Sequence, residues 1–387
     1  MEDVMITGVG QTPVAEHWDI GLRDLAFAAI QDAIHDAGGI KPQAIYIGNM
    51  LAPNLSNQAH LGALFADFSG LTGIEAVTVE AADASGGAAL RQGYLAVKSG
   101  LVQTALVLGV EKMTDKIGSS VQAALATTGD ADYEAVQGVT PTVQAAMTMQ
   151  RYIHEHDMPI DGFAGFALTA HKNGTGNPDA MYRSGLQLEA YSSAEKTSDP
   201  MNIYDVAPRA DGAAALILTR SDLLPSNPHE MQVRIAGSSS AVDTLALHDR
   251  KDLLYFEAVQ LAAGKAMKQE GVLLEDIDLF EYHDSFSIYA ALALESVGFA
   301  IRGKGWKLAA EGEISIDGRI PCATMGGLKA RGFPGGATGV YQAVEAVIQL
   351  RGNAGVNQVK DASCALLLSM GGPGSTGVCH ILRTRRV

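Results

Sequence analysis

The chain has 387 residues, 47% of them hydrophobic and 43 of them glycine, and it carries a formal net charge of −15 at pH 7. This length fits two or three domains or one large duplicated unit, and the acidic balance without a basic stripe excludes a typical nucleic-acid-binding protein. The three cysteines, Cys322, Cys364 and Cys379, lack metal-ligand spacing, so we expect reduced thiols and no metal site. No apolar run approaches the roughly 20 residues of a membrane helix, and the first residues lack a signal-peptide pattern, so we expect a cytoplasmic protein.

Strand and helix patterns alternate in the first hundred residues. Apolar, β-prone runs predict strands at 4–10, 44–50 and 76–79, and helical spacing predicts helices at 22–37, 57–68 and 85–99. Gly38 and Gly100 are placed to end two of these helices. The next strand, 104–110, is apolar throughout, which is typical of a sheet covered on both faces.

This alternation fades between about residues 115 and 200. Helices are predicted at 141–156 and 162–173, and the segment is rich in Thr, Asn, Gly, Met and His, which predicts a small helical loop domain. A strand at 213–219 returns to the sheet pattern. A linker is predicted at 225–228, between two prolines.

The strand–helix pattern then restarts. Its predicted elements are strands at 232–236 and 277–282, helices at 253–270, 288–298 and 336–350, and a hairpin of 363–369 and 376–383. This repetition predicts a duplicated α/β fold. We expect an N-terminal half at 1–114 plus 201–225, a loop domain at 115–200 and a C-terminal half at 229–387.

Asp83 lies where the strand at 76–79 turns through small residues into the helix that begins near Ser85. Such a turn directs backbone N–H groups and the positive end of the helix dipole at its central residue. Aspartate is also among the best N-cap residues. The pattern therefore leaves two explanations, a helix cap or a chemical role.

The run from Glu80 to Gly87, Glu-Ala-Ala-Asp-Ala-Ser-Gly-Gly, resembles the nucleophile turn of the thiolase superfamily. It is most similar to the branch of the sterol-carrier-protein thiolases and archaeal acetoacetyl-CoA thiolases, where cysteine occupies the position of Asp83 and takes the acyl group. The phrases at 109–114, 171–178 and 204–220 resemble the same branch. The resemblance covers essentially the whole chain and implies a duplicated five-layer αβαβα fold.

Three C-terminal motifs extend the resemblance. In the phrase Tyr282 to Phe286, His283 falls on the oxyanion-hole histidine of the family, and Ser285 stands where some members have cysteine. The run from Gly326 to Gly339 matches the family glycine motif, but Phe333, after Gly332, replaces the histidine that activates the cysteine. In the C-terminal glycine loop, Met370 replaces the acid/base cysteine, and the amides of three glycines could line an oxyanion hole: Gly371, Gly372 and Gly374.

Because the cysteine and its histidine are both absent, the resemblance implies chemistry on a CoA thioester without a cysteine acyl-enzyme. Retro-aldol cleavage of a β-hydroxyacyl-CoA is favoured, because it needs a base and an enolate hole but no thiol. The candidate bases are Asp83, Tyr289 and Tyr341. Weak candidates for CoA contacts are His171, Ser238 and Ser239. The alternatives are an acetyl-CoA acetyltransferase-like acyltransferase and a non-catalytic, CoA-binding subunit of an acyltransferase complex.

The resemblance also implies partners. Coenzyme A would arrive as part of the substrate, and no separate bound cofactor is expected. We expect a homodimer in which strand 104–110 is the edge strand that pairs across a two-fold axis. Thiolase-like aldolases of sterol side-chain breakdown work with an OB-fold subunit, so an OB-fold, zinc-ribbon partner protein is a further expectation.

Overall fold

Nine strands form one strongly bent sheet in this computed structural model, which describes residues 2–224, 229 and 231–386. The N-terminal strands are β1 (Val4–Gln11), β2 (Ala44–Gly48), β3 (Glu75–Val79), β4 (Thr104–Glu111) and β7 (Gly212–Arg220). The C-terminal strands are β8 (Met231–Val242), β9 (Leu279–Glu281), β10 (Cys364–Gly371) and β11 (Thr376–Arg386). Their order is β3-β2-β4-β7-β1-β8-β11-β10-β9, and only two residue pairs join β1 to β8. The N-terminal and C-terminal strands therefore form two half-sheets that are joined only by this short contact.

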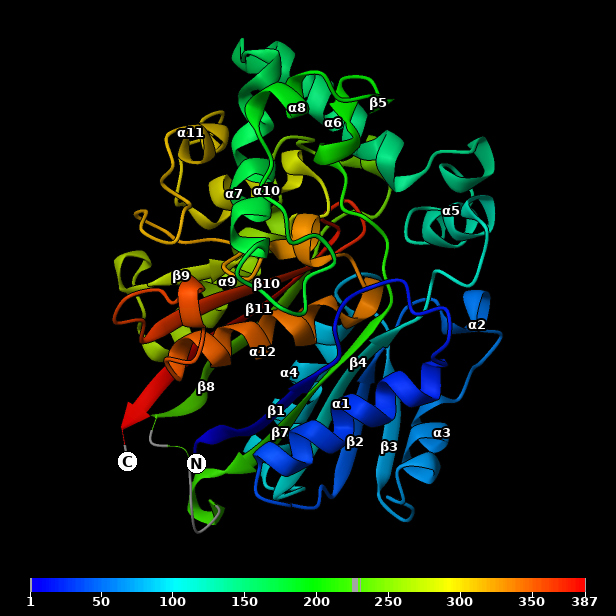
Figure 1. The fold of residues 1–387 in the computed structure, drawn as a ribbon, viewed down its shortest axis with the longest axis vertical. Coiled ribbons are helices and arrows are strands. Elements are labelled where there is room, and N and C mark those ends of the chain that lie inside the picture. Colours follow the sequence, from blue (N-terminus) through cyan, green and yellow to red (C-terminus); the bar gives the residue numbers. More distant parts are fainter. Residues whose placement is uncertain (1, 225–228, 230, 387) are drawn as a thin grey trace.

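Helices fill three layers around the two half-sheets (Figure 1). The outer layer on the N-terminal sheet holds α1 (Leu22–Asp36) and α3 (Leu61–Phe68), and the middle layer holds α4 (Ser85–Ser99) and α12 (Thr338–Leu350). The outer layer on the C-terminal sheet holds α9 (Glu257–Glu270) and α10 (Ser287–Val297). The predicted five-layer αβαβα fold is confirmed.

The alternation of side chains along β4 explains the layering. Leu106 and Leu108 pack in the core shared with α1, whereas Ala105 and Val107 pack in the core shared with α4 and α12. Successive side chains of a strand point to opposite faces, and both faces of β4 are covered. This is why the strand is apolar throughout.

The position of β4 contradicts one prediction. Strand 104–110 was expected at an edge, but β4 lies between β2 and β7 and is paired on both sides. The edge strand of the N-terminal half is β3, whose outer side is unpaired and whose Val77 side chain is 43% exposed. A fully apolar strand indicates two covered faces and two neighbours, so the expectation of an edge was wrong.

Most other elements lie where the sequence places them, although several differ in length; the strand predicted at 277–282, for example, is only Leu279–Glu281. The helix predicted at 57–68 begins only at Leu61, as α3, because His60 adopts a left-handed conformation with φ 61°. A separate short helix, α2 (Ala52–Leu55), precedes it and was not predicted. The strand predicted at 232–236 extends to Val242, since β8 pairs with β11 along its length. The helix predicted at 253–270 begins at Glu257. The linker predicted at 225–228 lies outside the described residues.

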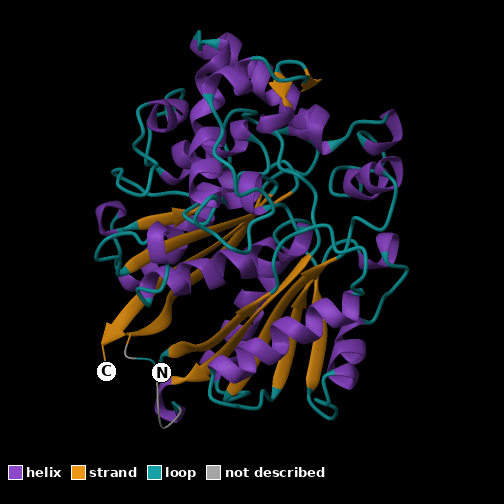
Figure 2. Ribbon diagram, in the orientation of Figure 1, coloured by secondary structure: helices purple, strands orange, loops and turns teal. Residues whose placement is uncertain are grey.

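The chain between β4 and β7 forms a layer of short elements above both sheets (Figure 2). They are α5 (Gly118–Ala126), α6 (Pro141–His156), α7 (Ala164–Gly174), α8 (Leu188–Ser192), β5 (Lys196–Ser198) and β6 (Met201–Asn202). Pro141 begins α6, and the Thr140 hydroxyl caps it by accepting a hydrogen bond from Val143 N. α7 packs against residues 327–331 and against α11 (Gly305–Ala310). These contacts place the segment over the site described next.

The described helices are too short or too polar to cross a membrane. Within the same residues, no three side chains of His, Cys, Asp or Glu gather as a metal ion would require.

Candidate active site

The turn between β3 and α4 holds Asp83 outside the helix. Ala82 adopts φ 51°, which is unfavourable for a residue with a side chain, and Ser85 secures the turn: its hydroxyl accepts from Ala81 N at 2.9 Å and donates to the Ala82 carbonyl at 2.6 Å. The N-cap position of α4 is Ala84, and no side chain caps it. Asp83 is therefore not the N-cap residue of α4, and its chemical role stays a prediction.

The Asp83 carboxyl has an unusual proton affinity. Burial raises the pKa of this carboxyl to about 7, and the nearby Glu80 carboxylate adds to the rise. Hydrogen bonds from the backbone N–H groups of Gly372 and of Asp83 itself lower the pKa and oppose this effect. Part of Asp83 remains accessible because it lines a cavity. A carboxyl group that is half ionised near neutral pH can both accept and return a proton.

The C-terminal glycine loop lies directly against this turn. A side chain at Gly371 would meet the Ala81 carbonyl at 2.5 Å, so only glycine permits the contact. The loop is held from the other side by Arg250, whose Nη1 donates to the Pro373 carbonyl at 2.5 Å. Gly372 lines the same cavity as Asp83. Gly374 does not line it and packs against the Phe256 ring instead.

A small cavity of about 50 Å³ brings the key residues together. Its lining includes Asp83, Ser285, Tyr289 and Phe333, which come from three separate segments. Its remaining walls come from α5, α6, the strand-like segment before β7, the residue before α10 and the glycine loop: Gln122, Leu125, Pro141, Thr142, Val206, Ala207, Arg209, Phe286 and Gly372. Among these lining residues, five were predicted from the sequence as site residues: Asp83, Ser285, Tyr289, Phe333 and Gly372. The others were not predicted as site residues.

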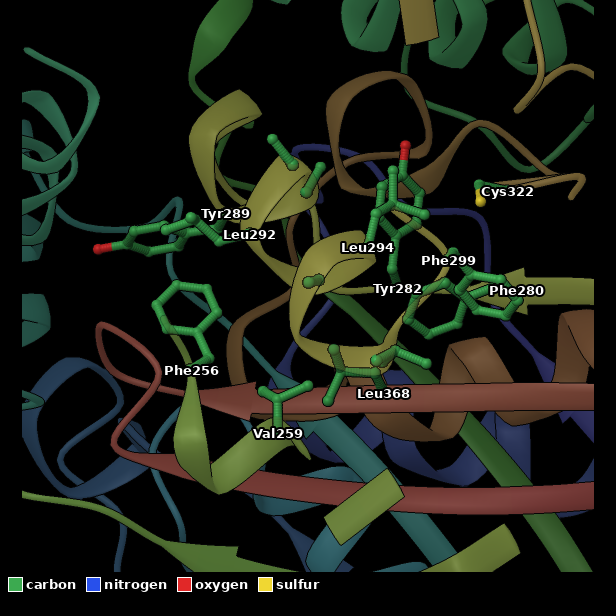
Figure 3. Packing of buried hydrophobic residues seen from close by; sticks show 14 of the residues in the cluster. Phe256, Val259, Phe280, Tyr282, Tyr289, Leu292, Leu294, Phe299, Cys322 and Leu368 are labelled. Atoms are coloured by element: carbon green, nitrogen blue, oxygen red, sulfur yellow. The ribbon is translucent and has the colours of Figure 1, made fainter. Parts of the chain in front are cut away.

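Tyr289 points its hydroxyl away from the aromatic and aliphatic cluster around it, as Figure 3 shows. Phe256 and Phe286 pack edge-to-face on its ring, at centroid distances of 5.5 Å and 5.1 Å, and they fix its direction. The hydroxyl is buried without a hydrogen-bond partner among the described residues. Burial raises its pKa well above the usual value of a phenol, although the Arg250 guanidinium lowers it. Tyr289 is therefore protonated at neutral pH, and its hydroxyl is free to donate to a group in the cavity.

His283 lies behind the wall of the small cavity, separated from it by the Phe333 side chain. Its ring packs edge-to-face on Phe333, with centroids 6.0 Å apart, and it is not part of the lining. Burial, with a smaller effect from Arg331, lowers its pKa to about 3, so the imidazole is neutral and carries one N–H. Neither ring nitrogen has a hydrogen-bond partner among the described residues. Gly332 precedes Phe333 at φ 113°, a conformation that only glycine adopts readily.

A second, much larger cavity of about 1,070 Å³ opens to the surface and meets the small one. Val206, Ala207 and Arg209 line both. Among the walls of the large cavity are four cations and four ring side chains: Lys116, Arg183, Arg209, Lys329, Trp18, His171, Tyr182 and Tyr204. The combination of positive charge and aromatic surface suits a long ligand with phosphates and a ring system.

Two of these residues are fixed in the cavity wall by contacts with other segments. His171 stacks on Tyr182 with centroids 5.9 Å apart, and burial lowers its pKa. Lys329 is buried and donates to the Asp205 carbonyl at 2.8 Å, and its burial lowers its pKa to about 8. His171 therefore lines the large cavity, and its contact with CoA stays a prediction.

Several other expected residues lie elsewhere. Tyr341 donates its hydroxyl to the Thr12 carbonyl at 2.9 Å in the core between β1 and α12, and it lines neither cavity. Ser238 and Ser239 are buried in β8, where the Ser238 carbonyl accepts from Arg91. The three cysteines are fully buried in the core, in or beside β9, β10 and β11: Cys322, Cys364 and Cys379. No thiol therefore lines either cavity.

The comparisons with known proteins match this architecture. The model of the thiolase N-terminal domain matches residues 4–222, and that of the thiolase C-terminal domain-like family matches residues 239–384. The chain belongs to the thiolase family. It is 42% identical to an acetyl-CoA acetyltransferase of Methanothermobacter thermautotrophicus over 98% of this chain and 99% of that protein.

Two more distant thiolase-fold proteins are also similar. The benzoylsuccinyl-CoA thiolase subunit BbsB of Thauera aromatica is 26% identical over 99% of this chain and 97% of its own. A solved structure described as an Ltp2-ChsH2(DUF35) aldolase superposes with a TM-score of 0.84 at 22% identity, covering 98% of this chain and 97% of that one. At this identity the superposition shows a shared fold.

Proposed function

We propose that this thiolase-family protein cleaves or forms a C–C bond in a CoA thioester without a cysteine acyl-enzyme, with retro-aldol cleavage of a β-hydroxyacyl-CoA as the favoured reaction. The observation that carries the proposal is the small cavity, where a carboxyl group with a pKa of about 7 occupies the turn expected to hold the nucleophile. The phenol of Tyr289 lines the same cavity, and no thiol does.

The proposed reaction uses two proton transfers that balance. The Asp83 carboxylate takes the proton of the β-hydroxyl group, and the Cα–Cβ bond breaks. An aldehyde or ketone is released, and the enolate of the shortened thioester stays bound. Tyr289 then donates its proton to the α-carbon of the enolate, which gives the acyl-CoA. The proton on Asp83 returns to Tyr289 before the next turnover. Asp83 and Tyr289 suit these roles because their pKa values are displaced to different ranges.

The large cavity supports a CoA thioester as the substrate class. It shares Val206, Ala207 and Arg209 with the small cavity. Its exposed cations Lys116 and Arg183 suit phosphate groups. The relatives named above are called acetyltransferase and thiolase. The function is tested by assaying β-hydroxyacyl-CoA and β-ketoacyl-CoA esters for carbonyl product, with and without an OB-fold, zinc-ribbon partner. Turnover of only β-ketoacyl-CoA with free CoA would overturn the proposal.

We expect acetoacetyl-CoA thiolysis to be negligible, because Asp83 and Phe333 replace the thiol and its histidine. The measurements are thiolysis with free CoA and mass spectrometry of the protein after incubation with acyl-CoA. A stable acyl adduct together with turnover of roughly 1 per second or faster would instead support the acetyl-CoA acetyltransferase alternative. Binding of CoA esters with no turnover of any ester would support the non-catalytic subunit.

We also expect a homodimer, now through β3 rather than β4. Among the described residues the outer backbone edge of β3 is unpaired and the strand carries the exposed Val77 side chain, so a second copy could pair with this edge and extend the sheet. Val77→Lys should raise the dimer dissociation constant at least tenfold, measured by light scattering across a concentration series. Leu101→Lys, at a side chain that is 85% exposed outside β3, is the matched control. A wild-type monomer at micromolar concentration would contradict this expectation.

A further inference from the structure

Arg209 differs from the other buried cations around the site. Arg331 pairs with Glu345 at 2.5 Å, Arg250 donates to the Pro373 carbonyl, and Lys329 donates to the Asp205 carbonyl. The Arg209 guanidinium has no ion pair and no side-chain hydrogen bond among the described residues, although the residue is half-buried. Burial also lowers its pKa, with no acidic group to oppose the effect. A partly desolvated guanidinium without a protein partner is a suitable group to bind an anionic ligand.

The backbone fixes Arg209 at the inner end of the large cavity. The Phe333 N–H donates to the Pro208 carbonyl at 2.9 Å, and the Ala210 N–H donates to the Phe333 carbonyl at 3.1 Å, so Arg209 and Phe333 lie side by side in a strand-like pair. Arg209 lines the large and the small cavity, and thus the neck between them. Its place is beside the reacting end of a bound thioester, not at the exposed mouth that suits phosphates.

We propose that Arg209 binds a carboxylate on the acyl group, so that the substrate is the CoA thioester of a short dicarboxylic acid; this rests on the proposed function. The guanidinium forms a two-pronged pair with the carboxylate, which neutral acyl groups cannot offer. The small cavity has room for only about three or four water-sized groups. An acyl group that fits this space places its carboxylate only a few atoms from the thioester, beside Arg209 at the neck between the two cavities.

The test is the affinity of unreactive CoA esters, measured by calorimetry on the full chain. Succinyl-CoA is compared with 4-methylpentanoyl-CoA, and glutaryl-CoA with 5-methylhexanoyl-CoA, since an isopropyl group matches the shape of a carboxylate without its charge. We expect the wild type to bind the carboxylate member of at least one pair roughly 10- to 100-fold more tightly. Arg209→Gln should abolish this preference, and Arg209→Lys should keep part of it.

Arg183→Gln is the matched control, because Arg183 lines only the large cavity and is exposed. It should weaken both members of a pair alike and leave their ratio unchanged. Equal binding within both pairs by the wild type, or an unchanged ratio in Arg209→Gln, would overturn the role of Arg209 and leave the proposed function standing. Failure of every CoA compound, free CoA included, to bind would overturn the proposed function as well.

Discussion

Asp83→Asn should lower turnover of the cognate β-hydroxyacyl-CoA by roughly 100-fold or more, because a positioned general base contributes about 10²- to 10⁴-fold to the rate. Asparagine keeps the shape of the side chain but cannot accept the proton. The loss should appear in kcat with little change in KM, measured at pH 8 where the wild-type carboxyl is ionised. Asp83→Ala should be equally inactive. Glu80→Gln, at the exposed carboxylate three residues earlier, is the control and should remain within a few-fold of the wild type.

The pH dependence of the wild type provides a second readout. Since the pKa of Asp83 is about 7, kcat should rise as the pH increases through about 7 and then level off. His283 cannot produce this step, because burial lowers its pKa to about 3. An activity that stays constant between pH 5.5 and 8.5 would show that Asp83 is not the base.

Stability should change in the opposite direction to activity. The pKa of Asp83 is raised from about 3.9 in an unfolded chain to about 7 in the fold. Its protonated form therefore contributes stability that is fully present below about pH 4 and is lost as the pH rises through 7. Asp83→Asn should consequently have a higher free energy of unfolding than the wild type at pH 8, measured in urea, and the gain should vanish near pH 4. A helix cap would instead lose about 0.5–2 kcal/mol.

Local motifs in the sequence were enough to predict the fold and much of the small cavity. Asp83, Ser285, Phe333 and Gly372 lie on four separate segments, yet each belongs to a glycine-rich or catalytic-loop phrase whose backbone fixes its position. The phrases at 109–114 and 204–220 meet at Asp211, which is fully buried and accepts hydrogen bonds from Lys112, Met113 and Thr114. Such short-range patterns carry their own geometry, and so they can be recognised before a structure exists.

The remaining features depend on contacts between distant segments, which no local pattern reveals. Arg209 lies inside a recognised phrase, but its exposure to the cavity depends on walls that α5 and α6 contribute. Tyr341 and Tyr289 are both aromatic residues on helices that follow catalytic loops. Only the packing of α12 against β1 turns Tyr341 toward Thr12, while Phe256 and Phe286 turn Tyr289 toward the cavity. Helical spacing alone could not separate these two tyrosines.

His283→Leu should lower kcat and kcat/KM together by roughly 100-fold, as expected for loss of a donor that acts mainly on the developing enolate oxygen. The role proposed for the neutral imidazole N–H is to polarise the thioester oxygen, and since His283 lies behind Phe333 and outside the cavity lining, this role requires the Phe333 ring to turn aside when substrate binds. Leucine fills similar space but donates nothing. The pH at which kcat rises should remain near 7, since that step belongs to Asp83.

The same variant should not lose stability, and this separates a catalytic histidine from a structural one. Both ring nitrogens of His283 are buried without partners in the described part of the chain, so replacing the ring with an apolar group removes a cost rather than an interaction. His380→Leu is the matched control: this histidine is equally buried in β11, its Nε2 lies 3.0 Å from the Gly87 carbonyl, and it lines neither cavity. The control should lose stability in urea while kcat stays within a few-fold. Full turnover by His283→Leu would remove His283 from the mechanism and leave the oxyanion to backbone N–H groups such as that of Gly372.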